Sequence, residues 1–161
     1  MLLVIAGEGP ALKSLRLEVE KRALSDNVLF VGYLDRRHEL PDCYSAANVF
    51  VFASHTETQG LVLLEAMAQG VPVVALAEMG TKDVLKPGSG VLIAENDIED
   101  FSAKVMYLLR DNSAATQLGD VGRAYAGTWS ASTQAEHMAD FYLEVIERQS
   151  EVQTAARAYA V

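Results

Sequence analysis

Short apolar runs rich in β-branched residues alternate along this chain with longer segments that have helical periodicity. The apolar runs predict strands at residues 2–6, 28–31, 49–53, 71–76 and 91–93. The segments between and after them predict helices at residues 10–23, in the segment that ends at 44, and at 61–69, 81–85, 98–110, 114–127 and 132–149. Strands that alternate with helices imply right-handed crossovers between parallel strands. The predicted fold class is therefore α/β, with one doubly wound parallel sheet.

Size and composition narrow the classes of protein to consider. A chain of 161 residues is one domain by length, and we assign residues 1–149 to it and residues 150–161 to a frayed or disordered tail. Its apolar runs are too short to cross a bilayer. A net charge of -9 argues against nucleic acid as a partner and against polybasic docking on anionic lipid. The single cysteine, Cys43, excludes an internal disulfide and a cysteine-rich metal site. Together these features indicate a cytoplasmic protein.

The chain opens directly on its first predicted strand, residues 2–6. That strand is apolar throughout, which predicts a central position covered on both faces. We therefore expect that the chain lacks the first strand and helix of its domain.

The segment from Ser54 to Ala68 carries the most informative pattern. It starts where a buried strand ends, and ligands of open α/β sheets bind at the carboxyl ends of strands. Gly60 stands where the backbone turns into a helix. The free N–H groups of Gly60, Leu61 and Val62 would then point outward at the positive end of the helix dipole. This arrangement predicts an anion site made from backbone groups, suited to a diphosphate.

Two glutamates flank this turn. Glu65 lies in a helix that is apolar nearly all round, so we expect it to be buried, where a carboxylate needs hydrogen-bond partners. It follows Leu61 by one helical turn, from where it could accept hydrogen bonds from a ribose diol. Glu57 precedes the helix and could reach a sugar beyond the phosphates. The alternatives are a satisfied buried polar residue for Glu65 and an ordinary loop carboxylate for Glu57.

Glu57-x7-Glu65 belongs to a longer pattern, Ser-x-x-Glu-Thr-x-Gly-Leu-x-x-x-Glu-Ala-Met-Ala-x-Gly-x-Pro-Val-Val. This pattern resembles the retaining glycosyltransferases of family 4, the glycosyl transferases group 1. Four flanking segments are similar to that family as well: Gly7-Glu8-Gly9-Pro10, Val28-x-Phe30-x-Gly32-Tyr33, Tyr44-x-x-Ala47-Asn48-Val49-Phe50 and Trp129-Ser130. The resemblance covers residues 2 to about 148.

The resemblance implies a GT-B fold, in which two Rossmann-like domains hold a nucleotide-sugar donor, and identifies this chain with the C-terminal domain. It implies that Glu57 is the catalytic carboxylate near the transferred sugar. It assigns donor binding to Glu57, Thr58, Gln59, Gly60, Leu61, Val62 and Glu65. It also places Tyr33 and Leu34 against the base, with Gly7 and Gly9 as further candidate contacts.

The sequence departs from the family in two places. Gly80-Thr81-Lys82-Asp83 stands where the family has Gly-Gly-x-x-Glu. The family's diphosphate-neutralising Arg and Lys precede the Gly-x-Gly-Pro strand, so we expect them, and the N-terminal acceptor-binding domain, to be missing here. Lys82 could approach the diphosphate, or it is a solvated loop lysine.

The resulting expectation is retaining transfer from a nucleoside-diphosphate sugar to an unknown acceptor, a glycan or lipid of the cell envelope. We expect no cofactor and no obligatory metal, since His55 beside Glu57 lacks a third ligand. The isolated chain should be inactive, and any contact with the inner face of the membrane should run through the missing domain. The alternatives are a non-catalytic nucleotide-binding domain and a flavodoxin-like signalling domain.

Overall fold

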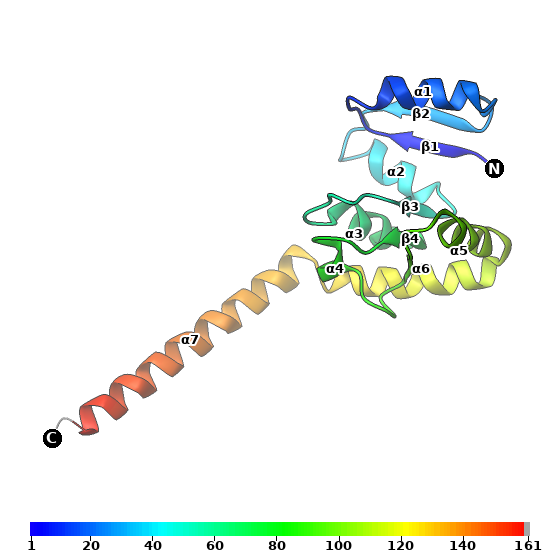
Figure 1. Cartoon of the computed structure of the whole chain (residues 1–161). Coiled ribbons are helices and arrows are strands. Elements are labelled where there is room, and N and C mark those ends of the chain that lie inside the picture. The colour runs from blue at the N-terminus through cyan, green and yellow to red at the C-terminus, as the bar shows by residue number, and fades with distance from the viewer. Residues whose placement is uncertain (160–161) are drawn as a thin grey trace. The chain divides into compact units, whose positions relative to one another are not determined.

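The computed structural model describes the backbone of residues 1–159 (Figure 1). Side chains are described as far as Gln149. The elements are, in order, β1 (Leu3–Ala6), α1 (Leu12–Lys21), β2 (Val28–Gly32), α2 (Glu39–Ser45), β3 (Phe50–Phe52), α3 (Leu61–Ala68), β4 (Val73–Leu76), α4 (Thr81–Val84), β5 (Val91–Ala94), α5 (Ile98–Arg110), α6 (Asn112–Gly127) and α7 (Ala131–Tyr159). The predicted order of strands and helices is confirmed. Every strand pair is parallel, which confirms the α/β class.

The strands form two sheets, whereas the sequence predicted one. β1 pairs with β2, and β3, β4 and β5 form the second sheet in that order. The chain correspondingly divides into two compact units, Met1–Ala46 and the chain from Ala47 onward. In a doubly wound sheet the first strand is central, with the second and third on one side and the later strands on the other. Within the second unit, the order β3-β4-β5 is that of the later strands of such a sheet. The absence of a first strand and helix stays a prediction.

The predicted burial of the first strand is wrong. Leu3 and Val4 of β1 are each 40% exposed. The physical reason is that β1 pairs with β2 along one edge only, and no other described strand pairs with it. An apolar run predicts that a strand can be covered on both faces, but it does not supply the neighbours that cover it.

The second unit has a well-packed core beneath its three-stranded sheet. β4 is buried along its whole length. Val74 and Leu76 of β4 pack with Ala94 of β5 and Leu108 of α5. The central strand of this sheet therefore fixes the position of the loops that leave its carboxyl end.

Helix α6 holds α3 in place at the far end from the turn described below. A Cβ built on Gly119 of α6 would lie 2.1 Å from the carbonyl oxygen of Gly70, so the two backbones meet as only glycine allows. The Nη2 of Arg123 donates a hydrogen bond to the carbonyl of Gln69 at 3.0 Å. These contacts anchor the C-terminal end of α3 against the core.

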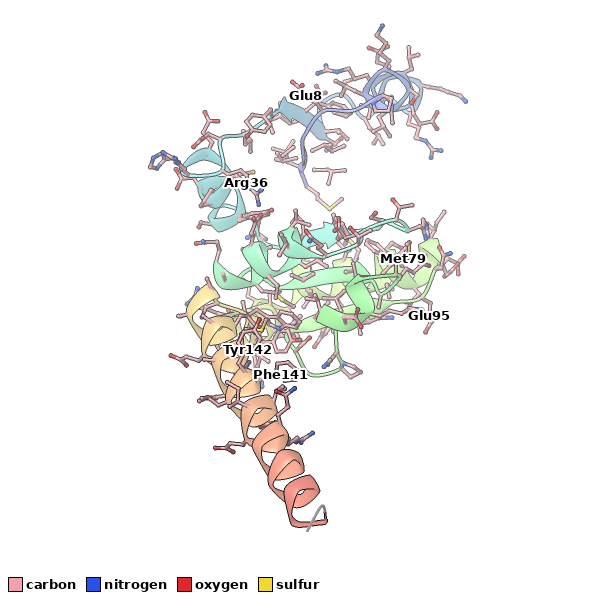
Figure 2. The ribbon with its side chains drawn as sticks, turned by 90° about the vertical axis from the view of Figure 1, so that its left-hand side faces the viewer. Glu8, Arg36, Met79, Glu95, Phe141 and Tyr142 are labelled. Carbon is pink, nitrogen blue, oxygen red and sulfur yellow. The ribbon has the colours of Figure 1, made fainter. Side chains whose placement is uncertain are left out.

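Helix α7 is longer than predicted and runs to Tyr159. Ala160 and Val161 lie outside the described residues, so a frayed tail over residues 150–161 stays a prediction. Several large apolar side chains of α7 are exposed, among them Phe141 and Tyr142 (Figure 2). None of the described helices is both long enough and apolar enough to span a bilayer.

Candidate functional site

The turn between β3 and α3 is built around Gly60. This residue has φ 71°, in the left-handed region, and it is the N-cap of α3. A Cβ there would lie 3.4 Å from Cδ1 of Leu63 and 3.5 Å from Cγ2 of Val84. Glycine suits the position on two counts, because the conformation disfavours other residues and the space around it is filled.

The side chain of Glu57 closes this turn. Its Oε1 accepts hydrogen bonds from the N–H of Gln59 at 2.9 Å and from the N–H of Gly60 at 3.0 Å. These bonds, above all the one from Gly60, hold the pKa of the Glu57 carboxyl below its usual range. The sequence predicted that the N–H of Gly60 would be free for a ligand. That expectation is wrong, because a carboxylate within the same loop already occupies it.

The next two backbone N–H groups are available. In the part of the chain that the structure describes, the N–H groups of Leu61 and Val62 have no hydrogen-bond partner, and no side chain caps α3. Leu61 is 49% exposed. The first N–H groups of a helix carry a partial positive charge that attracts anions. The turn can therefore offer two adjacent donors to an anionic group from solvent.

Glu65 lies one turn into α3, where the sequence placed it, but it is only partly buried. The buried face of α3 is formed by Leu63, Ala66 and Met67. Glu65 lies beside that face. The full burial that the apolar helix predicted for its side chain is therefore wrong. Thr58 and Gln59 are exposed. The structure thus brings the predicted residues from Glu57 to Glu65 together around one helix N-terminus.

The other predicted residues belong to the first unit. Gly7 has φ 116° and donates its N–H to the carbonyl of Gly32 at 2.7 Å. Gly9 has open space where a Cβ would lie. Tyr33 is 69% exposed and Leu34 is partly exposed. Their roles in donor binding stay predictions.

The sequence drew attention to Gly80-Thr81-Lys82-Asp83 only as a departure from the family pattern, and it did not predict that residues 77–80, between β4 and α4, pack against the turn. Glu78 Oε2 lies 2.8 Å from Nδ1 of His55. The N–H of Gly80 donates to the carbonyl of Glu57 at 3.2 Å. The spacing of residues within one segment gives no signal for such contacts, because they join residues from two different loops.

A pocket of about 440 Å³ lies where β4 and β5 end, and Lys82, Met79 and Glu95 are among the residues that line it. Lys82 is thus placed on the pocket beside the turn.

A larger hollow of about 660 Å³, between α5 and α6, is lined by Ala103, Met106, Tyr107, Arg110, Asp111 and Asn112. It is remote in the fold from the strand ends at which ligands bind, so we leave it out of the site. Among the described side chains, no group of three or more His, Cys, Asp or Glu is placed to hold a metal ion.

Parallel strands with a helix N-terminus at their carboxyl ends form the ligand-binding edge that is typical of doubly wound α/β domains. Residues 1–125 match the model of the family described as glycosyl transferases group 1. The chain belongs to this family.

Two curated relatives illustrate how similar the chain is in sequence to known glycosyltransferases. The chain is 40% identical over 113 residues to D-inositol 3-phosphate glycosyltransferase of Thermobispora bispora, covering 68% of this chain and 26% of that protein. It is 32% identical over 148 residues to GDP-mannose-dependent alpha-(1-6)-phosphatidylinositol monomannoside mannosyltransferase of Mycobacterium tuberculosis, covering 86% of this chain and 38% of that protein. The chain thus spans well under half the length of these relatives.

Solved structures confirm the fold. The C-terminal domain of the glycosyl transferase group 1 family protein LpcC from Francisella tularensis aligns with a TM-score of 0.70 and 26% identity, over 79% of this chain and 68% of that one. Anabaena HepE in complex with UDP aligns with a TM-score of 0.78 and 19% identity, over 89% of this chain and 41% of that one. The chain has the fold of the C-terminal domain of GT-B glycosyltransferases.

Proposed function

We propose that this chain binds a nucleoside-diphosphate sugar and forms the donor-binding half of a retaining glycosyltransferase. The observation that carries the proposal is the pair of N–H groups at Leu61 and Val62, at the start of α3, for which the described part of the chain supplies no hydrogen-bond partner. They are the donors for the diphosphate. Membership of the family and the UDP complex of HepE support this assignment.

Each glutamate has a separate partner in the proposal. Glu65 lies one helical turn beyond Leu61 and binds the ribose, the part that every donor shares. Glu57 is the catalytic carboxylate near the transferred sugar. Its lowered pKa keeps it ionised at neutral pH, so it can stabilise positive charge that develops on the sugar in the transition state. The exposed Tyr33, with Leu34, contacts the base.

The whole reaction needs an acceptor domain, which we place in a longer polypeptide. The bond between the sugar C1 and the diphosphate oxygen breaks, and the diphosphate leaves with the electron pair. A bond forms between C1 and an acceptor oxygen, the proton of the acceptor hydroxyl passes to the departing diphosphate oxygen, and the anomeric configuration is retained. The acceptor is a glycan or lipid of the cell envelope, and the transfer takes place in the cytoplasm, at the inner face of the membrane. No metal is required, and the 161-residue chain alone does not turn over.

Calorimetric titration of the chain with UDP, GDP and flavin mononucleotide tests the proposal. Wild type should bind one of the two nucleoside diphosphates and not the flavin. Glu65→Gln should weaken that binding about ten- to a hundredfold, because a hydrogen bond to a charged group contributes roughly 1.5–3 kcal/mol. The exposed Glu136 of α7 provides the matched control, and Glu136→Gln should bind as wild type does.

Binding of neither nucleoside diphosphate by the wild-type chain would contradict the proposal. Preferential binding of the flavin would favour the flavodoxin-like alternative. If Glu65→Gln lowered the melting temperature and left affinity unchanged, Glu65 would be a structural residue and the ribose contact would have to lie elsewhere.

A further inference from the structure

Two loops of the second unit lie against each other at the carboxyl ends of β3 and β4. We call residues 54–60 the donor loop and residues 77–80 the clamp loop. His55 Nδ1 and Glu78 Oε2 are 2.8 Å apart, and the N–H of Gly80 donates to the carbonyl of Glu57 at 3.2 Å. A Cβ on Gly80 would lie 1.9 Å from the carbonyl oxygen of Thr58. The clamp loop therefore touches the donor loop at three successive points.

The clamp loop is itself held from within the core. Thr81 is fully buried. Its Oγ1 donates to the carbonyl of Glu78 at 2.6 Å and accepts from the N–H of Glu78 at 2.8 Å. Met79, which follows Glu78 in the chain, has φ 48°, a left-handed conformation that is rare for a long side chain and marks a locally constrained backbone. Glu78 is consequently presented to His55 from a fixed backbone.

The contacts form a continuous chain from the clamp loop to the start of α3. The backbone carbonyl of Glu57 is bonded to Gly80, and its carboxylate is bonded to the N–H groups of Gln59 and Gly60. Gly60 is the N-cap of α3. A displacement of the donor loop at His55 would thus carry Glu57 with it and change where the first N–H groups of α3 point.

We propose that His55 and Glu78 are positioning residues, which lock the donor loop in the conformation that presents the Leu61 and Val62 N–H groups to a diphosphate. The proposal rests on the proposed function of the same turn. This role is distinct from that of a metal ligand, because Nδ1 of His55 is bonded directly to the carboxylate of Glu78 on the second loop. It also differs from a stability role, because the side chains of His55 and Glu78 are 52% and 34% exposed and exposed ion pairs contribute little to folding.

A double-mutant cycle tests the proposal in the 161-residue chain. His55→Ala, Glu78→Ala and the double variant are titrated with UDP and GDP, and with uridine and guanosine. Each single variant should lose about tenfold in affinity for the nucleoside diphosphate, and the double variant should lose no more than either single. Affinity for the plain nucleoside and the melting temperature should stay close to the wild-type values.

Two further variants sharpen the test. His55→Asn keeps an N–H donor close to the place of Nδ1 and should recover most of the affinity that His55→Ala loses. His137→Ala removes an exposed histidine of α7 and should bind as wild type does. Recovery by asparagine is the readout that a role in stability alone would not produce.

The outcomes separate this proposal from the proposed function. A wild-type chain that binds neither UDP nor GDP overturns both. A wild-type chain that binds, with single variants that bind equally well, overturns the positioning role alone. If the two losses of affinity multiply in the double variant, the two residues act independently, and the positioning role is overturned. Parallel losses for nucleoside and diphosphate, with a fall in melting temperature, assign the pair a structural role instead.

Discussion

The β1–α1 turn and the β3–α3 turn occupy equivalent places, each at the carboxyl end of a parallel strand that leads into a helix. In the first turn, space is open around the Cβ positions of Gly7 and Gly9, and α1 follows Ala11 in an ordinary right-handed conformation. In the second turn, Gly60 is left-handed and enclosed, and a carboxylate from Glu57 is bonded to two N–H groups. Both turns contain glycine, but among the described residues a side chain is bonded to backbone N–H groups of the turn only in the second.

This difference shows what an anion site requires beyond a glycine-rich sequence. Neither α1 nor α3 has an acidic residue in its first turn or a side chain that caps it, so these features do not distinguish the two turns. In the second turn, Glu57 fixes the backbone and two further N–H groups remain at the start of α3. Fixed donors lose little entropy when a ligand binds, so the second turn is the better prepared site.

The largest expected effect concerns the carboxylates of the two turns. In a polypeptide that includes the acceptor domain, Glu57→Gln should lower turnover about a hundredfold or more, because it removes a charge close to the reacting sugar. Affinity for the nucleoside diphosphate should stay within about threefold, since the glutamine oxygen can still accept from the turn. Steady-state kinetics and calorimetry on the same variant measure both quantities.

Glu8 of the β1–α1 turn is the matched control, and Glu8→Gln should change turnover by less than about twofold. Equal losses in the two variants would remove the distinction between the turns. A large loss of diphosphate affinity in Glu57→Gln would show that Glu57 acts mainly on the turn.

The second prediction compares the glycines. Gly60→Ala should lower the free energy of unfolding by about 1–2 kcal/mol, because alanine is disfavoured at a φ of 71°. Gly9→Ala should change it by less than about 0.5 kcal/mol, since its Cβ would meet open space. Urea denaturation of the two variants beside wild type measures the difference. Equal effects would mean that Gly60 carries no conformational constraint.

The smallest expected effect is on the pH dependence of stability. The folded-state pKa of Glu57 is lowered by its bonds to Gly60 and Gln59, so the folded protein binds fewer protons there than the unfolded chain. The contribution of Glu57 to stability is therefore present above the unfolded pKa and lost as the pH falls through the folded pKa. Melting curves should show the gap between wild type and Glu57→Gln narrowing toward acid pH. A gap that is constant with pH would contradict the carboxylate's role in the turn.

The fold could be predicted largely from the sequence because its signals are local. α5 begins after Asp97, whose side chain accepts from the N–H of Asp100, and α6 begins after Asp111, whose side chain accepts from the N–H of Ala114. Such caps are short-range and readable from residue type. The exposure of β1 could not be predicted, because burial depends on neighbouring strands that its own residues do not specify.

At the candidate site, likewise, the placement of residues within one segment could be predicted from the sequence and contacts between loops could not. Glu57, Gly60 and Glu65 could be placed around α3 because they belong to one continuous segment. The bond from Glu57 to the N–H of Gly60 depends on the side-chain conformation inside the loop, which residue type alone leaves open. The contact between His55 and Glu78 joins two loops that are brought together only by the pairing of β3 with β4.

The most direct test of the central claim is an NMR titration of the chain that follows its backbone amide signals. Addition of UDP or GDP should shift the amide resonances of Leu61 and Val62 more than any others in the second unit, because the diphosphate accepts hydrogen bonds from them. Uridine or guanosine at the same concentration should leave these two signals nearly unmoved. Diphosphate-induced shifts confined to the hollow between α5 and α6, with Leu61 and Val62 unchanged, would contradict the account.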